Sequence, residues 1–557
     1  MSLNVNSRRR RLQDPILTAT IAFVILVLLL FIVYPLISIL KNSFVDGEGR
    51  ISVASYIALF HNTNFLTAFR NTMRLGLVSG ASSTVVGFIF AYTIVRVKSR
   101  FKPLYNAVTI MPIISPPFVL AFSAICLLGR RGIITHDLLG LKWDIYGFKG
   151  LVIVQTMVFF PMASMLFTGL MRNLDSSMEE AARNLGASRF KVFTSITIPM
   201  LLSGIANAFL LSFTESVTDF ANPMILGGGY KTLASQIYIQ AVANYDMQTG
   251  TAVASFLLFV TVVIFVIQKA WLDKRSYVTL TGKATREKEL IDSRATVILT
   301  NGVCLFCSFM ILLFYLFVFL GAFSSTWGVD YTPSLKNFQY IFSYGDIKPI
   351  KDTLLISILA SPICGILSMV IAYLIVQKRF KGRALIEYTS MLGMAVPGTV
   401  FGLGYILSFN TKPLVLTNTL AILVIVLVMT RLPVGVRSGV AALRQIDPSI
   451  EEAAADLGAN SATVFRTITI PLIKPAFFSS LVFGFIKSMT AVSAVVFLVS
   501  ANYSLLTVRV MQYVDKGLMG YASALSTVLV VIVFVAVGIM YAALAKMGVS
   551  RDDIDVF

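Results

Sequence analysis

Residues 179–199 read EEAARNLGASRFKVFTSITIP, and residues 451–471 read EEAAADLGANSATVFRTITIP. Thirteen of the 21 positions are identical, without a gap, at a constant offset of 272 residues. The same offset pairs Pro161 with Pro433. Because self-similarity at a fixed period marks a repeated structural unit, we interpret the chain as a tandem duplication.

The composition is that of a membrane protein. Of the 557 residues 57% are hydrophobic and 13% are charged, and the mean hydropathy is +0.82. About 20 apolar residues cross a hydrocarbon core of roughly 30 Å, and no charge lies between Asp14 and Lys41. This run is about twice as long as a signal-peptide core, and no small-x-small cleavage site follows it, so we predict a retained first span.

The hydropathy pattern predicts an all-α polytopic membrane protein with two pseudo-symmetric halves of six spans each. The halves are residues 1–272 and 296–557, joined by a polar cytoplasmic linker at 273–295. The two repeats run parallel because six is even. The predicted spans are 16–40, 70–95, 104–128, 150–171, 200–226, 250–271, 296–321, 353–377, 385–409, 415–436, 476–500 and 522–546.

The net charge of +19 does not require a nucleic acid partner, because the positions of the basic residues account for it. Lys and Arg gather in short patches between spans, at residues 8–11, 96–102 and 378–383. Cytoplasmic loops carry such an excess of basic residues. Assigning these patches to the cytoplasm places both termini there and predicts a multi-pass protein of the bacterial inner membrane.

Each repeated segment lies between the fourth and fifth spans of its half, on the predicted cytoplasmic side. Acidic residues favour the start of a helix there, and small residues let a partner approach the backbone closely. The predicted contact residues are Glu179, Glu180, Ala181, Ala182, Gly186 and Pro199 in the first copy, and Glu451, Glu452, Ala453, Ala454, Gly458 and Pro471 in the second.

The pattern E-A-A-x-x-x-G-x9-I-x-x-P, present from Glu180 to Pro199 and from Glu452 to Pro471, resembles the hallmark loop of binding-protein-dependent ABC importer permeases. Both copies have Ile before the final Pro, where the family usually has Leu. The resemblance implies a type I ABC importer-like fold, with each loop forming a coupling helix in a cleft of an ATPase subunit. Two loops imply two copies of that subunit.

The chain has no ATPase machinery of its own. A phosphate-binding loop needs G-x-x-x-x-G-K-[ST], and the nearest stretch, GGGYKT at 227–232, lacks this spacing. The only histidines, His61 and His136, lie in no metal-ligand or nucleophile–base motif, so we predict solvated loop residues, no catalytic residues and no metal site. The chain is expected to bind no cofactor, with ATP and magnesium held by the partner subunits.

Ionisable residues at membrane depth are costly and usually face a cavity or a partner, and three of those within the predicted spans are candidates for the translocation path. Glu215 and Asp219 share one helical face of the fifth span, and the 272-residue offset pairs Glu215 with Lys487. We predict that Glu215 and Lys487 interact across the translocation path, with Asp219 nearby. A structural ion pair or a side chain reaching the interface is the alternative.

The substrate is indicated only by resemblance. Segments 220–241 and 489–517 resemble those of fused permeases for ferric iron uptake, and an extracytoplasmic binding protein is implied as a partner. It is expected to dock on the loops at 41–69, 227–249, 322–352 and 501–521. The same machinery importing a phosphonate, sugar phosphate, thiamine, polyamine or sulfate is the alternative within this class, and an ion-coupled secondary transporter is the alternative outside it. A channel would need a filter-like loop, and none is found.

Overall fold

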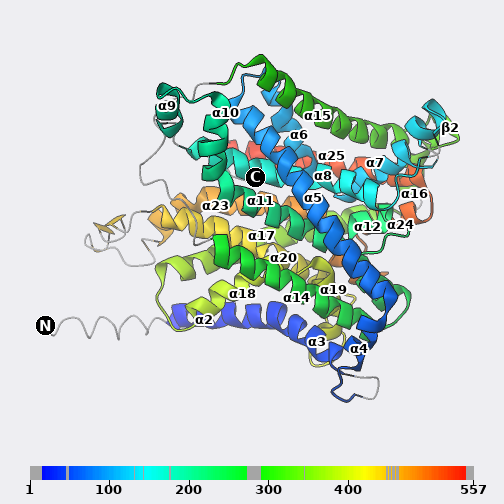
Figure 1. The fold of residues 1–557 in the computed structure, drawn as a ribbon. Coiled ribbons are helices and arrows are strands. Elements are labelled where there is room, and N and C mark those ends of the chain that lie inside the picture. Colours follow the sequence, from blue (N-terminus) through cyan, green and yellow to red (C-terminus); the bar gives the residue numbers. More distant parts are fainter. Residues whose placement is uncertain are drawn as a thin grey trace. The chain divides into compact units, whose positions relative to one another are not determined.

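A computed structural model describes residues 15–45, 49–130, 132–141, 143–174, 177–272, 290–343, 345–446, 449–450, 453–454, 458, 463 and 465–546. The described chain is almost entirely helical (Figure 1). It forms two compact units, and neither is a sequence half. Unit 1 contains the described residues up to Ile51 together with Pro349–Leu505 and the described residues from Phe534 onward. Unit 2 contains Ser52–Lys348 and Leu506–Val533.

Unit 2 holds most of the first half and the first span of the second half. Its helices are α4 (Ala54–His61), α5 (Thr63–Arg96), α6 (Lys102–Ile114), α7 (Phe118–Leu128), η2 (Ile133–Leu138), α8 (Phe148–Asn173), α9 (Ser177–Asn184), α10 (Arg189–Val192), η3 (Phe193–Thr197), α11 (Ile198–Thr218), α12 (Ala221–Leu226), α13 (Leu233–Tyr238), η4 (Ile239–Ala243), α14 (Met247–Leu272), α15 (Arg294–Ala322), α16 (Lys336–Ser343) and α24 (Leu506–Asp515). A short antiparallel hairpin, β1 (Ser324–Thr326) and β2 (Asp330–Pro333), follows α15.

Unit 1 holds the first span of the chain and most of the second half. Its helices are α2 (Pro15–Leu28), η1 (Leu29–Val33), α3 (Tyr34–Ser43), α18 (Arg383–Ala395), α19 (Gly398–Phe409), α20 (Leu420–Arg444), η6 (Phe465–Thr469), α23 (Ile470–Met489) and η7 (Val495–Phe497). Helix α17 (Ile347–Gln377) belongs to it from Pro349, and α25 (Met519–Lys546) passes from unit 2 into unit 1 at Phe534.

The first span of each half packs into the unit formed by the other half. In unit 1 the Tyr405 hydroxyl donates to the carbonyl of Phe31 at 2.7 Å. In unit 2 the Ser123 hydroxyl donates to the carbonyl of Phe314 at 2.6 Å. The sequence repeat and the compact units therefore divide the chain differently.

The predicted number of spans agrees with the structure. Among the described residues, eleven helices have the length and hydropathy to cross a membrane, and the number is twelve if α18 and α19, bent by 114°, form one span. The break between α18 and α19 falls at Val396–Pro397, and the predicted third span is divided in the same way at Ser115–Pro117 into α6 and α7. Proline breaks these helices because it lacks an N–H and disfavours helical geometry in the preceding residue.

Two predicted spans extend well past the end of the helix that forms them. The fifth span was expected to reach residue 226, but α11 ends at Thr218, and the eleventh was expected to reach 500, but α23 ends at Met489. Asp219 leaves the helical conformation (φ −66°, ψ 121°), and its carboxylate accepts the Asn222 N–H at 3.3 Å. A short polar side chain that bonds nearby backbone competes with the helix in this way.

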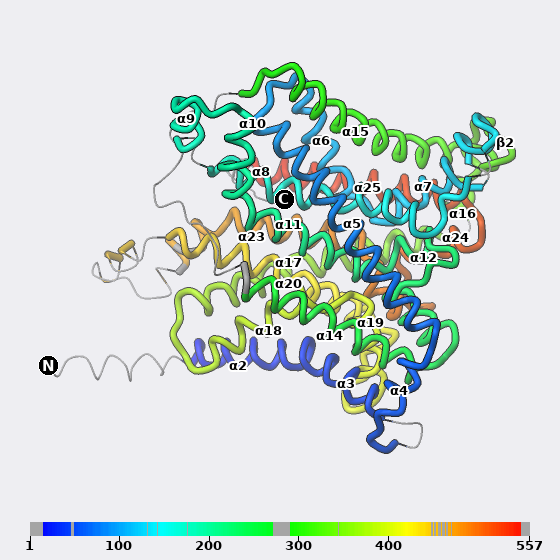
Figure 2. The backbone as a smooth tube through the Cα atoms, viewed as in Figure 1, coloured from blue at the N-terminus to red at the C-terminus, as the bar shows by residue number. Residues whose placement is uncertain are grey.

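Helices α5, α8 and α11 pack against one another in unit 2 (Figure 2). Small residues make this close approach possible: a Cβ on Gly87 of α5 would lie 2.7 Å from the Cβ of Ala163 on α8. A Cβ on Gly80 would lie 3.1 Å from the backbone nitrogen of Phe213 on α11. Membrane helices associate through such small residues, since lipid offers no hydrophobic driving force. The packed group fixes both ends of the segment between α8 and α11.

Candidate functional site

The first repeated segment forms a short helix–turn–helix that projects from the end of the α5, α8 and α11 group (Figure 1). We call residues 177–199 the first docking loop. Glu179 and Glu180 lie in the first turn of α9, near its positive N-terminal end. Ser188 begins α10, and its hydroxyl accepts the Lys191 N–H at 3.2 Å.

Gly186 makes the turn between the two helices. Its φ is +85°, a left-handed conformation that favours glycine. The Gly186 N–H donates to Arg183 O at 2.9 Å, and the Ala187 N–H donates to Ala182 O at 3.0 Å, so α9 ends in a Schellman motif. Gly458 in the second copy has the same φ of +85°. The duplicated glycine thus has the same left-handed φ in both copies.

The first docking loop exposes apolar side chains. Helix α9 buries no residue, and Leu185 and Phe190 are 89% and 77% exposed. Met178 is exposed as well. No Cβ placed on Gly186 would meet another atom within 4 Å. Three large apolar side chains are therefore exposed within 13 residues of this loop.

Glu179 is half-buried and bonds to residues outside α9. Its Oε1 accepts from Arg96 Nη2 and from the Thr197 hydroxyl, each at 2.9 Å. The side chains of Arg96 and Glu179 are 6% and 17% exposed. Glu179 therefore ties α9 to the end of α5 and to η3. Its predicted contact with an ATPase stays a prediction.

The remaining predicted docking residues occupy varied positions. In the first copy Ala181 and Pro199 are exposed, and Glu180 and Ala182 are half-buried. In the second copy Ala453, Gly458 and Pro471 are exposed and Ala454 is half-buried, whereas Glu451 and Glu452 lie outside the described residues.

Asp219 lies at the end of α11 in a network of amides. Its Oδ2 accepts from Gln155 Nε2 at 2.8 Å and from Asn222 Nδ2 at 2.7 Å. The Ser216 hydroxyl donates to Gln155 Oε1 at 2.5 Å. The network joins α8 to the break between α11 and α12. The second half has Ala491 in place of Asp219, so this arrangement exists once.

Glu215 lies on α11 in unit 2, and Lys487 lies on α23 in unit 1. The Nζ of Lys487 is 5.9 Å from the ring centroid of Phe483, and its carbonyl accepts from Arg431 Nη2 at 3.3 Å. The interaction between Glu215 and Lys487 stays a prediction, because the two residues belong to different units.

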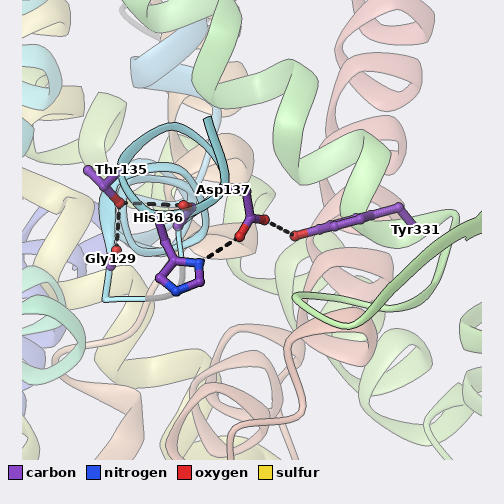
Figure 3. A network of polar contacts seen from close by, with 6 residues as sticks. Gly129, Thr135, His136, Asp137 and Tyr331 are labelled. Atoms are coloured by element: carbon purple, nitrogen blue, oxygen red, sulfur yellow. Dashed lines mark hydrogen bonds and ion pairs between the residues drawn. The ribbon is translucent and has the colours of Figure 1, made fainter. Parts of the chain in front are cut away.

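Both histidines are exposed. His136 Nδ1 lies 2.7 Å from Asp137 Oδ1, and the Tyr331 hydroxyl donates to Asp137 Oδ2 at 3.1 Å, so the network joins η2 to β2 (Figure 3). Burial, together with the bond to Asp137, raises the pKa of Tyr331 to about 12. Across the described part of the chain, no three His, Cys, Asp or Glu side chains are placed to share a metal ion.

A second polar cluster in unit 2 joins two of the loops predicted to meet a binding protein. Arg509 Nε donates to Asp346 Oδ1 at 2.7 Å, and the Tyr513 hydroxyl donates to Asp346 Oδ2 at 2.5 Å. The Asp346 side chain is 1% exposed. This buried pair fixes α24 against the segment before α17.

Sequence reasoning did not predict the roles of Arg96, Thr197 and Gln155. The sequence does mark Thr197 as a candidate, because the 272-residue offset pairs it with an identical residue, Thr469. For Arg96 the sequence indicates only membership of a basic patch that marks the cytoplasmic side. Gln155 is a polar residue in an apolar span, which is itself a reason to look for a polar partner.

Comparison with known proteins places the chain in a family. A model of the family described as "Binding-protein-dependent transport system inner membrane component" matches residues 83–276 and again residues 363–547. The chain belongs to this family. It is therefore a bacterial inner-membrane permease of an ABC importer, and the match to each half supports the duplication.

Its relatives include transport system permeases that match most of this chain. This permease is 35% identical over 533 residues to the ferric transport system permease protein FbpB of Actinobacillus pleuropneumoniae, covering 93% of this chain and 77% of that one. It is 37% identical over 510 residues to the putative ferric transport system permease protein FbpB 1 of Haemophilus influenzae, covering 88% and 79%. The molybdenum transport system permease protein ModB of Escherichia coli matches at 27% over 34% of this chain and 85% of its own length.

Among solved structures, a bacterial ABC transporter involved in the import of the acidic polysaccharide alginate is similar at 18% identity and a TM-score of 0.42. The match covers 49% of this permease and 99% of that chain. Membership of the binding-protein-dependent family favours the importer over the ion-coupled secondary transporter.

Proposed function

We propose that this permease forms the translocation path of an ATP-driven importer for ferric iron delivered by an extracytoplasmic binding protein. One observation carries the proposal: two relatives named as ferric transport permeases match 93% and 88% of this chain at 35% and 37% identity. The relatives named for sulfate and molybdenum match only 36% and 34% of the chain, at 26% and 27% identity.

The test is uptake by the complete system reconstituted in liposomes, with its ATPase and its binding protein. We expect radiolabelled ferric iron to accumulate only when the binding protein is outside and ATP is inside. Uptake of sulfate, molybdate or spermidine under the same conditions, without ferric uptake, would contradict the substrate. Uptake driven by an ion gradient without ATP would contradict the mechanism.

We also propose that the two repeated loops each dock one copy of an ATPase subunit, which supplies the ATP and magnesium site that this chain lacks. Both loops and both termini then lie in the cytoplasm, and the binding protein meets the opposite face. The exposed Leu185 and Phe190 and the shared geometry of Gly186 and Gly458 support this arrangement.

Cysteine cross-linking tests the docking directly. The four native cysteines are buried, so a cross-linker in solution should react only with a cysteine introduced at an exposed position. We expect Leu185→Cys in the first loop and Ala453→Cys in the second to cross-link to the ATPase subunit. Leu138→Cys is the matched control, because Leu138 is also strongly exposed (74%) but lies in η2, beyond the other end of the spans. Equal cross-linking at residues 138 and 185 would count against the docking loops.

A further inference from the structure

We propose that a cavity in unit 2, beside the first docking loop, binds the headgroup of an anionic glycerophospholipid from the adjacent leaflet. The cavity has a volume of about 600 Å³. It lies between the end of α5, the segment from α9 to η3, and the start of α15. Its membrane position follows from α5 and α15, which are both spans.

One wall of the cavity is apolar and continues along the membrane-spanning helices. Phe88 of α5, Phe193 of η3 and Leu299 of α15 line it. Leu299 is 70% exposed, as is expected of a side chain that faces lipid. An acyl chain can therefore leave the cavity along α15 without crossing a polar barrier.

The cavity also has basic residues in its lining. Arg96, Arg183 and Arg189 line the cavity together with Glu179 and Glu180, and three positive charges less two negative ones leave a net charge of +1. Glu179 already neutralises Arg96 at 2.9 Å. No ion pair found among the described residues includes Arg189. Basic pockets between spans on the cytoplasmic side bind anionic headgroups, and Arg189 supplies the charge for the phosphate.

Hydroxyl groups complete the lining. Ser293, Thr296 and Thr300 lie at the start of α15 and line the same cavity. They can donate to phosphate oxygens or accept from the hydroxyls of a glycerol headgroup. A free inorganic anion would use the arginine and hydroxyls but would leave the apolar wall in contact with water. The combined lining therefore favours a lipid.

The end of the linker between the halves builds one side of the cavity. The Ile291 N–H donates to Arg96 O at 2.8 Å, and the Lys98 N–H donates to Ile291 O at 3.1 Å. These bonds fix Leu290 and Ile291 beside the end of α5, where both line the cavity. The end of the predicted linker therefore forms part of the cavity wall.

Lipid retention by the full permease chain in detergent tests the proposal. The chain is titrated with dioleoyl phosphatidylglycerol or dioleoyl phosphatidylcholine, and bound lipid is counted by native mass spectrometry. We expect the wild type to prefer phosphatidylglycerol, and Arg189→Gln to weaken that lipid about fivefold, because one basic side chain near an anionic membrane surface contributes about that factor. Phosphatidylcholine binding should be unchanged.

Two further variants keep the result specific. Arg379→Gln removes the same charge from an exposed position in unit 1 and should change phosphatidylglycerol binding less than twofold. Thr296→Trp fills the cavity and should reduce binding of both lipids, with an unchanged elution volume as the check on folding.

Several outcomes would overturn the proposal. These are equal retention of the two lipids, an equal effect of the substitutions at 189 and 379, or retention unchanged by Thr296→Trp. Displacement of the lipid by millimolar inorganic phosphate would assign the site to a free anion instead.

Discussion

The tie between Glu179 and Arg96 gives the sharpest prediction about the docking loop. Helix α9 has eight residues and buries none of them, and isolated helices of that length are marginal in water. Its position therefore depends strongly on the two bonds that Glu179 accepts from Arg96 and Thr197. We predict that Glu179→Ala loosens α9 while the spans stay folded.

The structure sets the size of the effect. Removing one partner of a buried ion pair costs about 3–5 kcal/mol, because the other charge stays buried without compensation. Arg96 is 6% exposed, but Glu179 is 17% exposed and partly solvated, so we expect the lower end, about 3 kcal/mol. This is a factor of about 100 in the opening equilibrium of α9. Glu179→Gln keeps both acceptor bonds without the charge and should cost about 1 kcal/mol.

Hydrogen exchange of the amides in residues 177–187 is the assay, in the permease alone and in detergent. A double-mutant cycle with Arg96→Met and Glu179→Leu isolates the pair, and the double variant should be more protected than Glu179→Ala. The matched control is Asp292→Ala, which breaks the pair between Lys98 and Asp292. That pair is 3.3 Å long, its side chains are 67% and 69% exposed, and its loss should cost under about 1 kcal/mol.

The reasoning fails if Glu179→Ala changes exchange in α9 less than twofold. It also fails if the effects of Arg96→Met and Glu179→Leu simply add, since additivity would mean that the two side chains do not support each other. An equal effect of Asp292→Ala would show that the change is one of net charge.

Three other predictions concern the turn, the polar network and the pathway. Gly186→Ala should lower the free energy of unfolding of the docking loop by about 1 kcal/mol, because the φ of Gly186 is +85°. Gly186→Asn should lower it less, because Asn adopts the left-handed conformation more readily than Ala. Thermal denaturation of both variants checks this. Gln155→Leu should destabilise the permease by about 1–3 kcal/mol, because it removes the donor to Asp219 and the acceptor of the buried Ser216 hydroxyl. A fall in denaturation temperature is the measurement. Exchanging the charges of Glu215 and Lys487 should restore the iron uptake lost in each single reversal, and uptake unaffected by either reversal would exclude a pathway role.

The local features of the docking loop were largely predictable. The repeat located the loop, and its acidic residues predicted the start of a helix there, which α9 confirms. These features depend on backbone preferences that act over a few residues, such as the left-handed conformation that glycine accepts. The same reasoning failed at the ends of the fifth and eleventh spans, because hydropathy continued past the point where α11 and α23 end.

The sequence alone determined that the chain is duplicated, that about twelve apolar segments have the length to cross a membrane, and that the loop between the fourth and fifth spans is repeated. Length, hydropathy and repetition are properties of single segments, so they can be read without knowing which segments meet. Only the tertiary structure decided that the first span of each half joins the other half's unit, and that Arg96 holds Glu179. Apolar spans resemble one another in lipid, and their pairing depends on small residues and single polar contacts that no segment shows by itself.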